Sequence, residues 1–275
     1  RLPSMFEKMD ALKKVIITKG PLVELPEGMG EVMKDLAWLE VDFNRLETLP
    51  GSLDKANNLL YLYAAWNNIS KVPLSVWQHQ GLRHLDLSTN RIDQIPENTN
   101  LKDVATFYMS NNSISKLPSN FTGHYFLSFI SLSGNKLKRL PESIGNGALG
   151  SSLKLLEIAR NHLTSASFPE SFQNMKQMFL LDLRNNSLRT LPLMFDKLES
   201  LTELTVSGNP LCDGNVTVCD PPCSSKIQEL LDMEGFGCKK QCSDFCLDTT
   251  LEVPGCDIEC NVPSCSYSNG GCNDL

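Results

Sequence analysis

Three residues of catalytic type, His84, Asp86 and Ser88, alternate along one short segment of the chain. A histidine, a carboxylate and a hydroxyl can form a nucleophilic triad when each contacts the next at about 2.6–3.2 Å. The alternation instead predicts a β-strand, on which side chains of one face are spaced by about 6.6 Å. The three groups are therefore too far apart to relay a proton. The sequence also lacks GxSxG, HExxH, P-loop and dinucleotide-binding motifs, so we expect a protein that is not an enzyme.

The ten cysteines are the second group with distinctive chemistry, and all of them lie between Cys212 and Cys272. A zinc site would need CxxC pairs and histidines, and this region contains neither. An even number of closely spaced cysteines is typical of small modules that disulfides stabilise in an oxidising compartment. We therefore expect disulfides throughout and an extracellular protein, either secreted or at the cell surface.

A repeat occupies the rest of the chain and must position these residues. Segments 82–96 and 127–141 share the frame LxxLxLxxNxLxxLP. Its asparagine position recurs every 22–26 residues, at Gly20, Asn44, Asn67, Asn90, Asn112, Asn135, Asn161, Asn186 and Asn209. This frame resembles that of leucine-rich repeat proteins. The resemblance implies an α/β-type solenoid with parallel strands on its concave face and little helix, followed here by a small disulfide-rich module.

Each part of the frame has a structural reason. Both leucines of LxL face the core, because strand residues alternate. The asparagine side chain is expected to bond backbone groups that a packed solenoid cannot leave unpaired, and Gly20 weakens this ladder at the N-terminal end. The Pro-x-x-apolar half supplies a second buried row, which Thr99 interrupts. That row contains Phe6, Met29, Leu53, Val76, Phe121, Ile144, Phe172 and Phe195.

The outward strand positions lie two, four and six residues before each asparagine position, and they are rich in aromatic and acidic residues. Neighbouring strands are about 4.8 Å apart, so Trp38, Tyr61 and Tyr63 are expected to form one patch with Phe43 and Trp66 at its rim. Aromatic rings beside charges are typical of protein-binding surfaces, although such rings can also pack only against one another. The candidate binding residues are Trp38, Glu40, Asp42, Tyr61, Tyr63, Asp86, Tyr108 and Phe129, and Glu157 and Asp182 add further acids.

The segment after the last repeat resembles the cysteine-containing C-terminal caps of extracellular leucine-rich repeat proteins. It contains a predicted helix over residues 224–233, with Ser225 as its N-cap and Ile227, Leu230 and Leu231 on one face. The resemblance implies that this segment covers the exposed core of the last repeat. Three pairings are open for its four cysteines, which are Cys212, Cys219, Cys223 and Cys238.

The last six cysteines resemble a Lin-12/Notch repeat, a short disulfide module that binds calcium. The resemblance implies the pairs Cys242–Cys265, Cys246–Cys260 and Cys256–Cys272. It also implies Asp257, Asn261 and Asn269 as candidate calcium ligands. Ser268 and Gly271 stand where the family has two ligand aspartates, and calcium prefers carboxylates among its six to eight oxygens. We therefore expect no cofactor on which the module depends, and at most a weak calcium site.

Charge and hydropathy exclude two classes of partner. Lys+Arg 25 against Asp+Glu 32 gives a net charge of -7, which argues against nucleic acid. No apolar run approaches the length of about 20 residues that a membrane span needs. Five N-x-S/T sequons predict N-linked glycans at exposed positions. They begin at Asn68, Asn111, Asn120, Asn185 and Asn215.

These patterns divide the chain into leucine-rich repeats over 1–211, a cysteine-rich cap over 212–240 and a Lin-12/Notch-like module over 241–275. Residues 2–6 are the second half of a repeat whose first half is missing, so we expect further chain before Arg1 or an open end.

The leading interpretation is a non-enzymatic extracellular protein-recognition module, a fragment of a receptor ectodomain or of a secreted binding protein. Its protein partner would bind the concave face or the open N-terminal end. The alternative is a glycosylated structural subunit of an extracellular filament, appendage or wall, whose molecules stack end to end. An intracellular scaffold shares the repeat but is opposed by the clustered cysteines.

Overall fold

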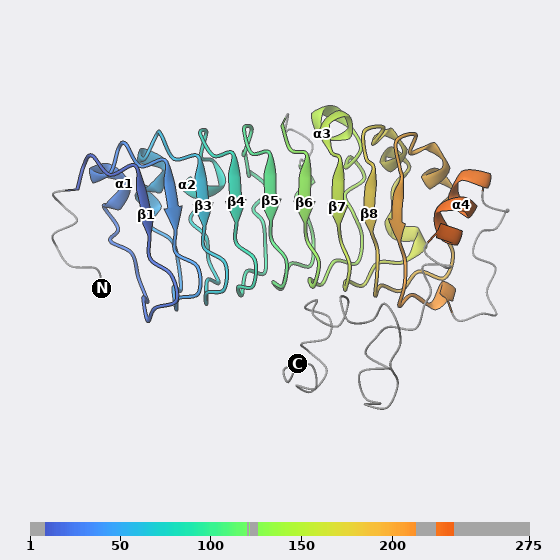
Figure 1. Cartoon of the computed structure of the whole chain (residues 1–275), viewed down its shortest axis with the longest axis horizontal. Helices are drawn as coiled ribbons and strands as arrows, with labels where there is room; N and C mark the ends of the chain where they lie inside the picture. Colours follow the sequence, from blue (N-terminus) through green and yellow to red (C-terminus); the bar gives the residue numbers. More distant parts are fainter. Residues whose placement is uncertain (1–8, 120, 122–125, 213–223, 234–275) are drawn as a thin grey trace, which may run out of the picture.

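The computed structural model describes residues 9–119, 121, 126–212 and 224–233. They form an elongated solenoid in which short strands lie side by side (Figure 1). Within the described residues one parallel sheet contains nine strands in sequence order. The strands are β1 (Lys14–Ile16), β2 (Trp38–Glu40), β3 (Tyr61–Tyr63), β4 (His84–Asp86), β5 (Thr106–Tyr108), β6 (Phe129–Ser131), β7 (Leu155–Glu157), β8 (Leu180–Asp182) and β9 (Glu203–Thr205).

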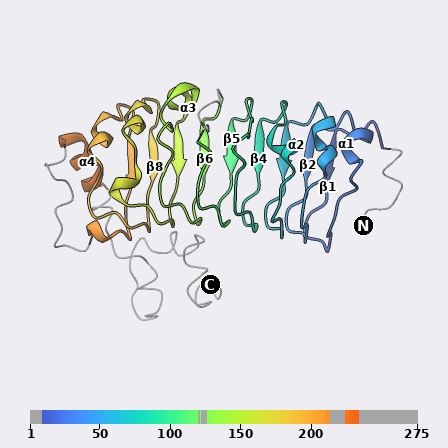
Figure 2. The ribbon, with the colours of Figure 1, turned by 180° about the vertical axis from the view of Figure 1, so that it is seen from behind.

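Helical structure is sparse, as the view from behind also shows (Figure 2). It lies in the segments that connect successive strands and after the last strand, β9. The α-helices are α1 (Met29–Val32), α2 (Leu74–Trp77), α3 (Gly147–Ser152) and α4 (Ser225–Met233). The 3-10 turns are η2 (Gly51–Lys55), η3 (Ser165–Ser167), η4 (Glu170–Asn174), η5 (Leu193–Lys197) and η6 (Pro210–Cys212). Turns of successive repeats pack on one another, α1 on η2, η2 on α2 and η4 on η5. They form the second layer of the solenoid.

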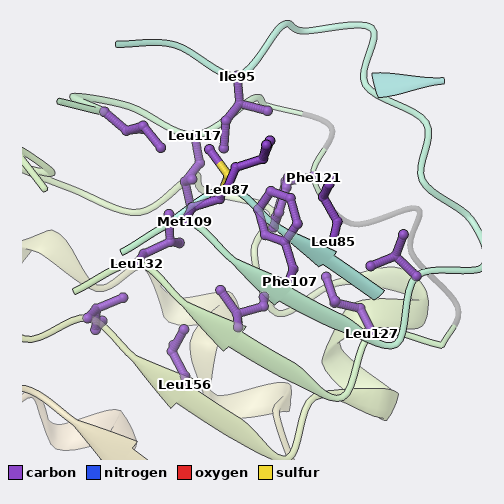
Figure 3. Close-up of a cluster of buried hydrophobic side chains, with 14 of the residues drawn as sticks. Leu85, Leu87, Ile95, Phe107, Met109, Leu117, Phe121, Leu127, Leu132 and Leu156 are labelled. Carbon is purple, nitrogen blue, oxygen red and sulfur yellow. The ribbon is translucent and has the colours of Figure 1, made fainter. Parts of the chain in front are cut away.

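The core consists of two rows of apolar side chains between these layers. Successive side chains of a strand point to opposite faces. The middle residue of each strand points into the core and is buried, while its two neighbours point outward. The second row is buried as the frame predicts, at Met29, Leu53, Val76, Phe121, Ile144, Phe172 and Phe195, while Phe6 lies outside the described residues. Thr99 is buried as well, and its hydroxyl donates to the Pro96 carbonyl at 2.7 Å. Near the middle of the solenoid the Phe107 and Phe121 rings lie 6.0 Å apart among leucines (Figure 3).

A ladder of asparagine side chains connects each repeat to the one before it. From Asn44 to Asn209, each Oδ1 accepts a backbone N–H of the preceding repeat at 2.9–3.2 Å. Each Nδ2 donates to a carbonyl of that preceding repeat and to one or more of its own. Buried backbone groups thus find partners, and Gly20 adds no side-chain bond at the N-terminal end.

The residue just before each ladder position adopts a left-handed backbone, with φ between 51 and 71°. This rim series is Lys19, Phe43, Trp66, Thr89, Asn111, Gly134, Arg160, Asn185 and Gly208. Glycine and asparagine tolerate this conformation, whereas bulky or β-branched residues are strained in it. The turn after every strand therefore has the same geometry, at a cost that depends on the rim residue.

Helix α4 covers the C-terminal end of the described solenoid and packs on β9 and η5. Its apolar face is the predicted one, with Ile227, Leu230 and Leu231 buried. The predicted cap is wrong by one residue. The Ile227 N–H donates to Ser224 Oγ at 3.4 Å, so Ser224 rather than Ser225 stands at the position whose side chain reaches the third helical N–H.

Candidate functional site

The parallel register brings outward side chains of successive strands side by side. Trp38 pairs with Tyr61, Tyr61 with His84, and so on along the sheet without a shift. A second row runs from Glu40 through Tyr63, Asp86 and Tyr108 to Ser131. We call the outward side of the strands the sheet face. Every candidate binding residue predicted from the sequence lies on it or directly after a strand, and all of these residues are partly exposed.

Six rings form a continuous aromatic row on the sheet face of strands β2–β6. The ring centroids are separated by 4.8 Å for Trp38–Tyr61, 5.0 Å for Trp38–Tyr63, 4.6 Å for Tyr63–His84, 5.2 Å for His84–Tyr108 and 4.6 Å for Tyr108–Phe129. The planes are tilted by 33–43°, and all six residues are partly exposed. Such contacts are attractive, and they hold the row in place.

His84 is a member of the row that the sequence analysis missed, because its residue type suggested catalysis. Its Nδ1 bonds to the Thr106 hydroxyl, whereas Asp86 Oδ1 accepts the Ser88 N–H at 2.9 Å. The three residues therefore form no triad, as the strand spacing predicted. His84 is partly exposed and packs between Tyr63 and Tyr108.

Three carboxylates border the row, and their hydrogen bonds fix their orientation. Trp38 Nε1 donates to Glu40 Oε2 at 3.1 Å. The Ala65 N–H donates to Asp42 Oδ1 at 2.7 Å. Among the residues that the structure describes, Glu40, Asp42 and Asp86 form no ion pair. Their charge is available to a partner.

Burial and mutual repulsion change the ionisation of these groups. Burial raises the pKa of Asp42 to about 6, the hydrogen bond from Ala65 opposes this shift, and the charges of Asp86 and Glu40 add to it. Burial lowers the pKa of His84 below its ordinary value, more than Asp86 raises it, so the ring is neutral at pH 7. Burial likewise raises the pKa of Tyr63 and Tyr108. At neutral pH the sheet face therefore carries net negative charge around neutral rings.

One cation of the chain already contacts the row. Lys14 on β1 places its Nζ 4.2 Å from the centroid of the Trp38 ring. An ammonium at this distance over an indole face is a cation–π contact. This lysine was absent from the sequence-based list of candidates, although its register partner is Trp38.

Two further rings stand at the rim, at the predicted place. Phe43 and Trp66 stack at 5.4 Å with their planes 12° apart, and they are 46% and 49% exposed. Both occupy the left-handed rim position. Rings as exposed as these, in strained backbone positions, do not contribute to the packing of the core.

The sheet face of strands β7–β9 has a different character. Leu155 and Leu180 continue the first outward row, where strands β2–β6 carry rings. Asp182 is held by Arg184, whose Nη2 lies 2.9 Å from Asp182 Oδ2. The aromatic row is thus confined to strands β2–β6, whereas acidic residues continue on β7–β9 as Glu157, Asp182 and Glu203.

The remaining predicted sites fall mostly outside the described residues. These include nine of the cysteines, the calcium candidates Asp257, Asn261 and Asn269, and the sequons at Asn120 and Asn215. Cys212 is disulfide-bonded. Asn68, Asn111 and Asn185 are partly exposed at or beside the rim, and Asn111 Nδ2 donates to Thr89 Oγ1 at 3.4 Å.

Two searches of the described part of the chain found no candidate. No group of three or more His, Cys, Asp or Glu side chains is placed there to hold a metal ion. None of its helices has the length and apolar character that crossing a bilayer requires.

Comparisons with known proteins agree with this architecture. Models of the leucine-rich repeat match residues 151–211 and 81–100. Mouse lumican is 27% identical over 198 residues, which cover 71% of this chain and 50% of lumican. Rabbit lumican is 28% identical over 199 residues. The chain spans about half the length of the first of these curated relatives.

Solved structures share the fold. A leucine-rich repeat protein of Leptospira interrogans superposes with a TM-score of 0.72 at 24% identity, over 86% of this chain and 56% of that one. The functional domain of InlJ from Listeria monocytogenes, which includes a cysteine ladder, gives 0.61 at 25% identity over 74% and 41%. The ectodomain of the Arabidopsis thaliana receptor kinase GASSHO1/SCHENGEN3 gives 0.55 at 21% over 75% and 32%. With its parallel sheet, sparse helix and asparagine ladder, this chain has the solenoid fold of leucine-rich repeat proteins, and the repeat models match parts of it.

Proposed function

We propose that this chain is a non-enzymatic protein-recognition module that binds its partner on the sheet face of strands β2–β6. The continuous aromatic row with its three unpaired carboxylates carries the proposal. Aromatic anchors at the centre of a patch, with charges around them, supply most of the binding energy in protein interfaces. The buried leucine rows already satisfy the packing needs of the core, so these rings are available for a second purpose.

The proposed setting is extracellular, as part of a receptor ectodomain or a secreted binding protein. The ten clustered cysteines and the partly exposed sequons Asn68, Asn111 and Asn185 support this setting. The Arabidopsis ectodomain was solved in complex with CASPARIAN STRIP INTEGRITY FACTOR 2, and the analogy in fold is consistent with a partner here. The structural-subunit alternative stays a prediction, which self-association in sedimentation experiments would favour.

The proposal includes a disulfide-stapled tail and N-linked glycans. Intact-mass measurement with and without reductant is expected to show all ten cysteines paired, and glycosidase treatment is expected to reduce the mass. Free thiols on more than one pair would contradict the extracellular setting. Because Ser268 and Gly271 replace two ligand aspartates, the tail is expected to melt at the same temperature in chelator and in millimolar calcium.

The test of the binding surface replaces two rings and keeps the fold. The double variant carries alanine in place of Tyr61 and Tyr63. The matched control carries alanine in place of Leu155 and Leu180, which lie on the outward face of strands β7 and β8. Immobilised wild type, double variant and control are compared for the extracellular proteins that each retains. We expect a partner that the wild type and the control retain and that the double variant binds more than about 2 kcal/mol more weakly. Equal retention by all three would contradict the proposal.

A further inference from the structure

We propose that the partner presents a basic segment to the aromatic row, with a lysine or arginine side chain seated against the rings. The inference rests on the proposed binding function of this face and names the chemistry of the occupant. Three features support it: the charge of the face, the geometry of the rings and the length of the patch.

The carboxylates of the face outnumber the cations that the chain places beside it, of which Lys14 over Trp38 is one. The outward positions of strands β2–β6 and the residues two places beyond them carry three carboxylates, Glu40, Asp42 and Asp86. The same positions contain no lysine or arginine. On β8, by contrast, Asp182 is neutralised by Arg184 at 2.9 Å. A basic partner would supply to the carboxylates of strands β2–β6 the positive charge that Arg184 supplies to Asp182 on β8.

The geometry of the rings suits an ammonium or a guanidinium. The rings lie 4.6–5.2 Å from tilted neighbours, and each ring residue is partly exposed. A cation gains most over a ring face when carboxylates lie beside it. Lys14 over Trp38, with Glu40 bonded to the same indole, is an example of this arrangement within the chain. The mutual repulsion of Asp42, Asp86 and Glu40 is a further interaction that a bound cation would relieve.

The length of the patch indicates a segment rather than a single ion. From Trp38 on β2 to Phe129 on β6 the row crosses four strand intervals, which is about 19 Å. An extended peptide rises about 3.3 Å per residue, so about six residues would span it. The carboxylates are spread over several strands, and within the described residues no three acidic, histidine or cysteine side chains converge on one point. Several side chains of a basic segment can reach them where one metal ion cannot.

Synthetic peptides test this directly on the full chain. A twelve-residue peptide of alternating glycine and lysine is compared with the same peptide carrying glutamate, by calorimetry at physiological salt. We expect the lysine peptide to bind and the glutamate peptide not to bind. Absence of binding by the lysine peptide, and by an arginine version of it, would overturn the inference.

Variants separate a ring-assisted site from general attraction to an acidic protein. Tyr63→Leu removes a ring without changing charge and is expected to weaken the lysine peptide about tenfold. Trp38→Leu is the second ring variant if Tyr63→Leu perturbs the circular dichroism spectrum. Asp86→Asn is expected to weaken binding by a similar factor, and Glu203→Gln on β9 is its control with the same change in net charge. Equal losses for Asp86→Asn and Glu203→Gln, or no loss with either ring variant, would overturn the inference.

The two proposals can fail separately. A retained partner that depends on Tyr61 and Tyr63 but not on Asp86, together with unbound lysine peptides, would leave the binding function and remove its cationic chemistry. Partner retention that is unaffected by Tyr61 and Tyr63 would remove the binding function itself.

Discussion

The sheet face of strands β2–β6 and that of strands β7–β9 stand on the same framework and differ in most outward residues. Both are backed by leucine rows and tied by the same asparagine bonds. The first carries six contacting rings beside Glu40, Asp42 and Asp86. The second carries leucines and the acids Glu157, Asp182 and Glu203, of which Asp182 pairs with Arg184. The same framework supports both regions, so it does not by itself require rings on the first. The proposed binding function gives the rings a role there.

The rim residues also change along the solenoid, but the change falls between β4 and β5. Beyond strands β2, β3 and β4 the left-handed position holds Phe43, Trp66 and Thr89, residues that are strained there. Beyond the later strands it holds asparagine or glycine at every place except Arg160. Strain that persists in an otherwise regular repeat is a mark of functional sites. The N-terminal part of the solenoid is therefore less optimised for stability than the C-terminal part.

The largest effect is expected from a substitution in the asparagine ladder, which both regions share. Asn135→Ala removes the acceptor of the Ile114 N–H and the donor to the Met109 and Leu132 carbonyls, each at 2.9 Å. Leaving these buried groups unpaired should lower the free energy of unfolding by roughly 3 kcal/mol, as measured by urea denaturation.

The end of the ladder supplies the control for this change. Asn44→Ala breaks the bonds to Leu22 and Ile17 of the first described repeat, whose Gly20 offers no ladder amide, and the bonds to Val41 and Asp42 of its own repeat. Because end repeats can open alone, we expect a smaller loss of global stability there. Equal losses at Asn44 and Asn135 would mean that the ladder does not act between neighbours.

An intermediate effect concerns the charge of the first region. Asp42 has a pKa of about 6 instead of 3.8, so protonation stabilises the fold as the pH falls from 6 toward 4, and this stabilisation is lost as the pH rises through 6. Asp42→Asn carries no charge and should melt at a higher temperature than wild type at pH 7.5. The difference should disappear near pH 4.

The neighbouring charges decide how this result is interpreted. Glu40 and Asp86 remain on the sheet face in the variant, and Lys14 remains over Trp38. A difference in melting temperature that is the same at both pH values would show that Asp42 is not the group with the raised pKa.

The smallest expected effect concerns the rim. Thr89 is β-branched at a φ of 53°, so Thr89→Asn should stabilise the protein by up to about 1 kcal/mol. The matched control is Asn185→Thr in the other region, which should destabilise by a similar amount. If neither variant changes the urea midpoint, the rim conformation carries no strain.

Much of this architecture could be predicted from the sequence, because the repeat frame occurs nine times along the chain. The strands, the ladder and the second buried row follow from side-chain alternation and from the need to pair buried backbone groups. The aromatic row could be predicted only in part. Register placed Trp38, Tyr61 and Tyr63 together, but which rings touch depends on side-chain rotation, which the frame does not determine.

Two misses have identifiable causes. His84 was assigned by residue type, although its position in the same outward row as Tyr61 already placed it among the rings. Ser224 and Ser225 are adjacent hydroxyls, and the packing of α4 on the last repeat selects between them: Ser224 Oγ donates to Asp196 Oδ1 at 2.7 Å, a bond that links the helix start to η5.

The ladder spacing has a consequence for how such a chain can change over generations. The longest interval, from Asn135 to Asn161, contains α3, and the shortest, from Asn90 to Asn112, contains no helix or 3-10 turn in the described residues. Strand pairing keeps the same register across both. Insertions and deletions between strands are thus absorbed without displacing the outward residues. The strands of the sheet face keep the same spacing and register whatever the repeat length. Outward residues can therefore be substituted one at a time while the connecting segments change in length.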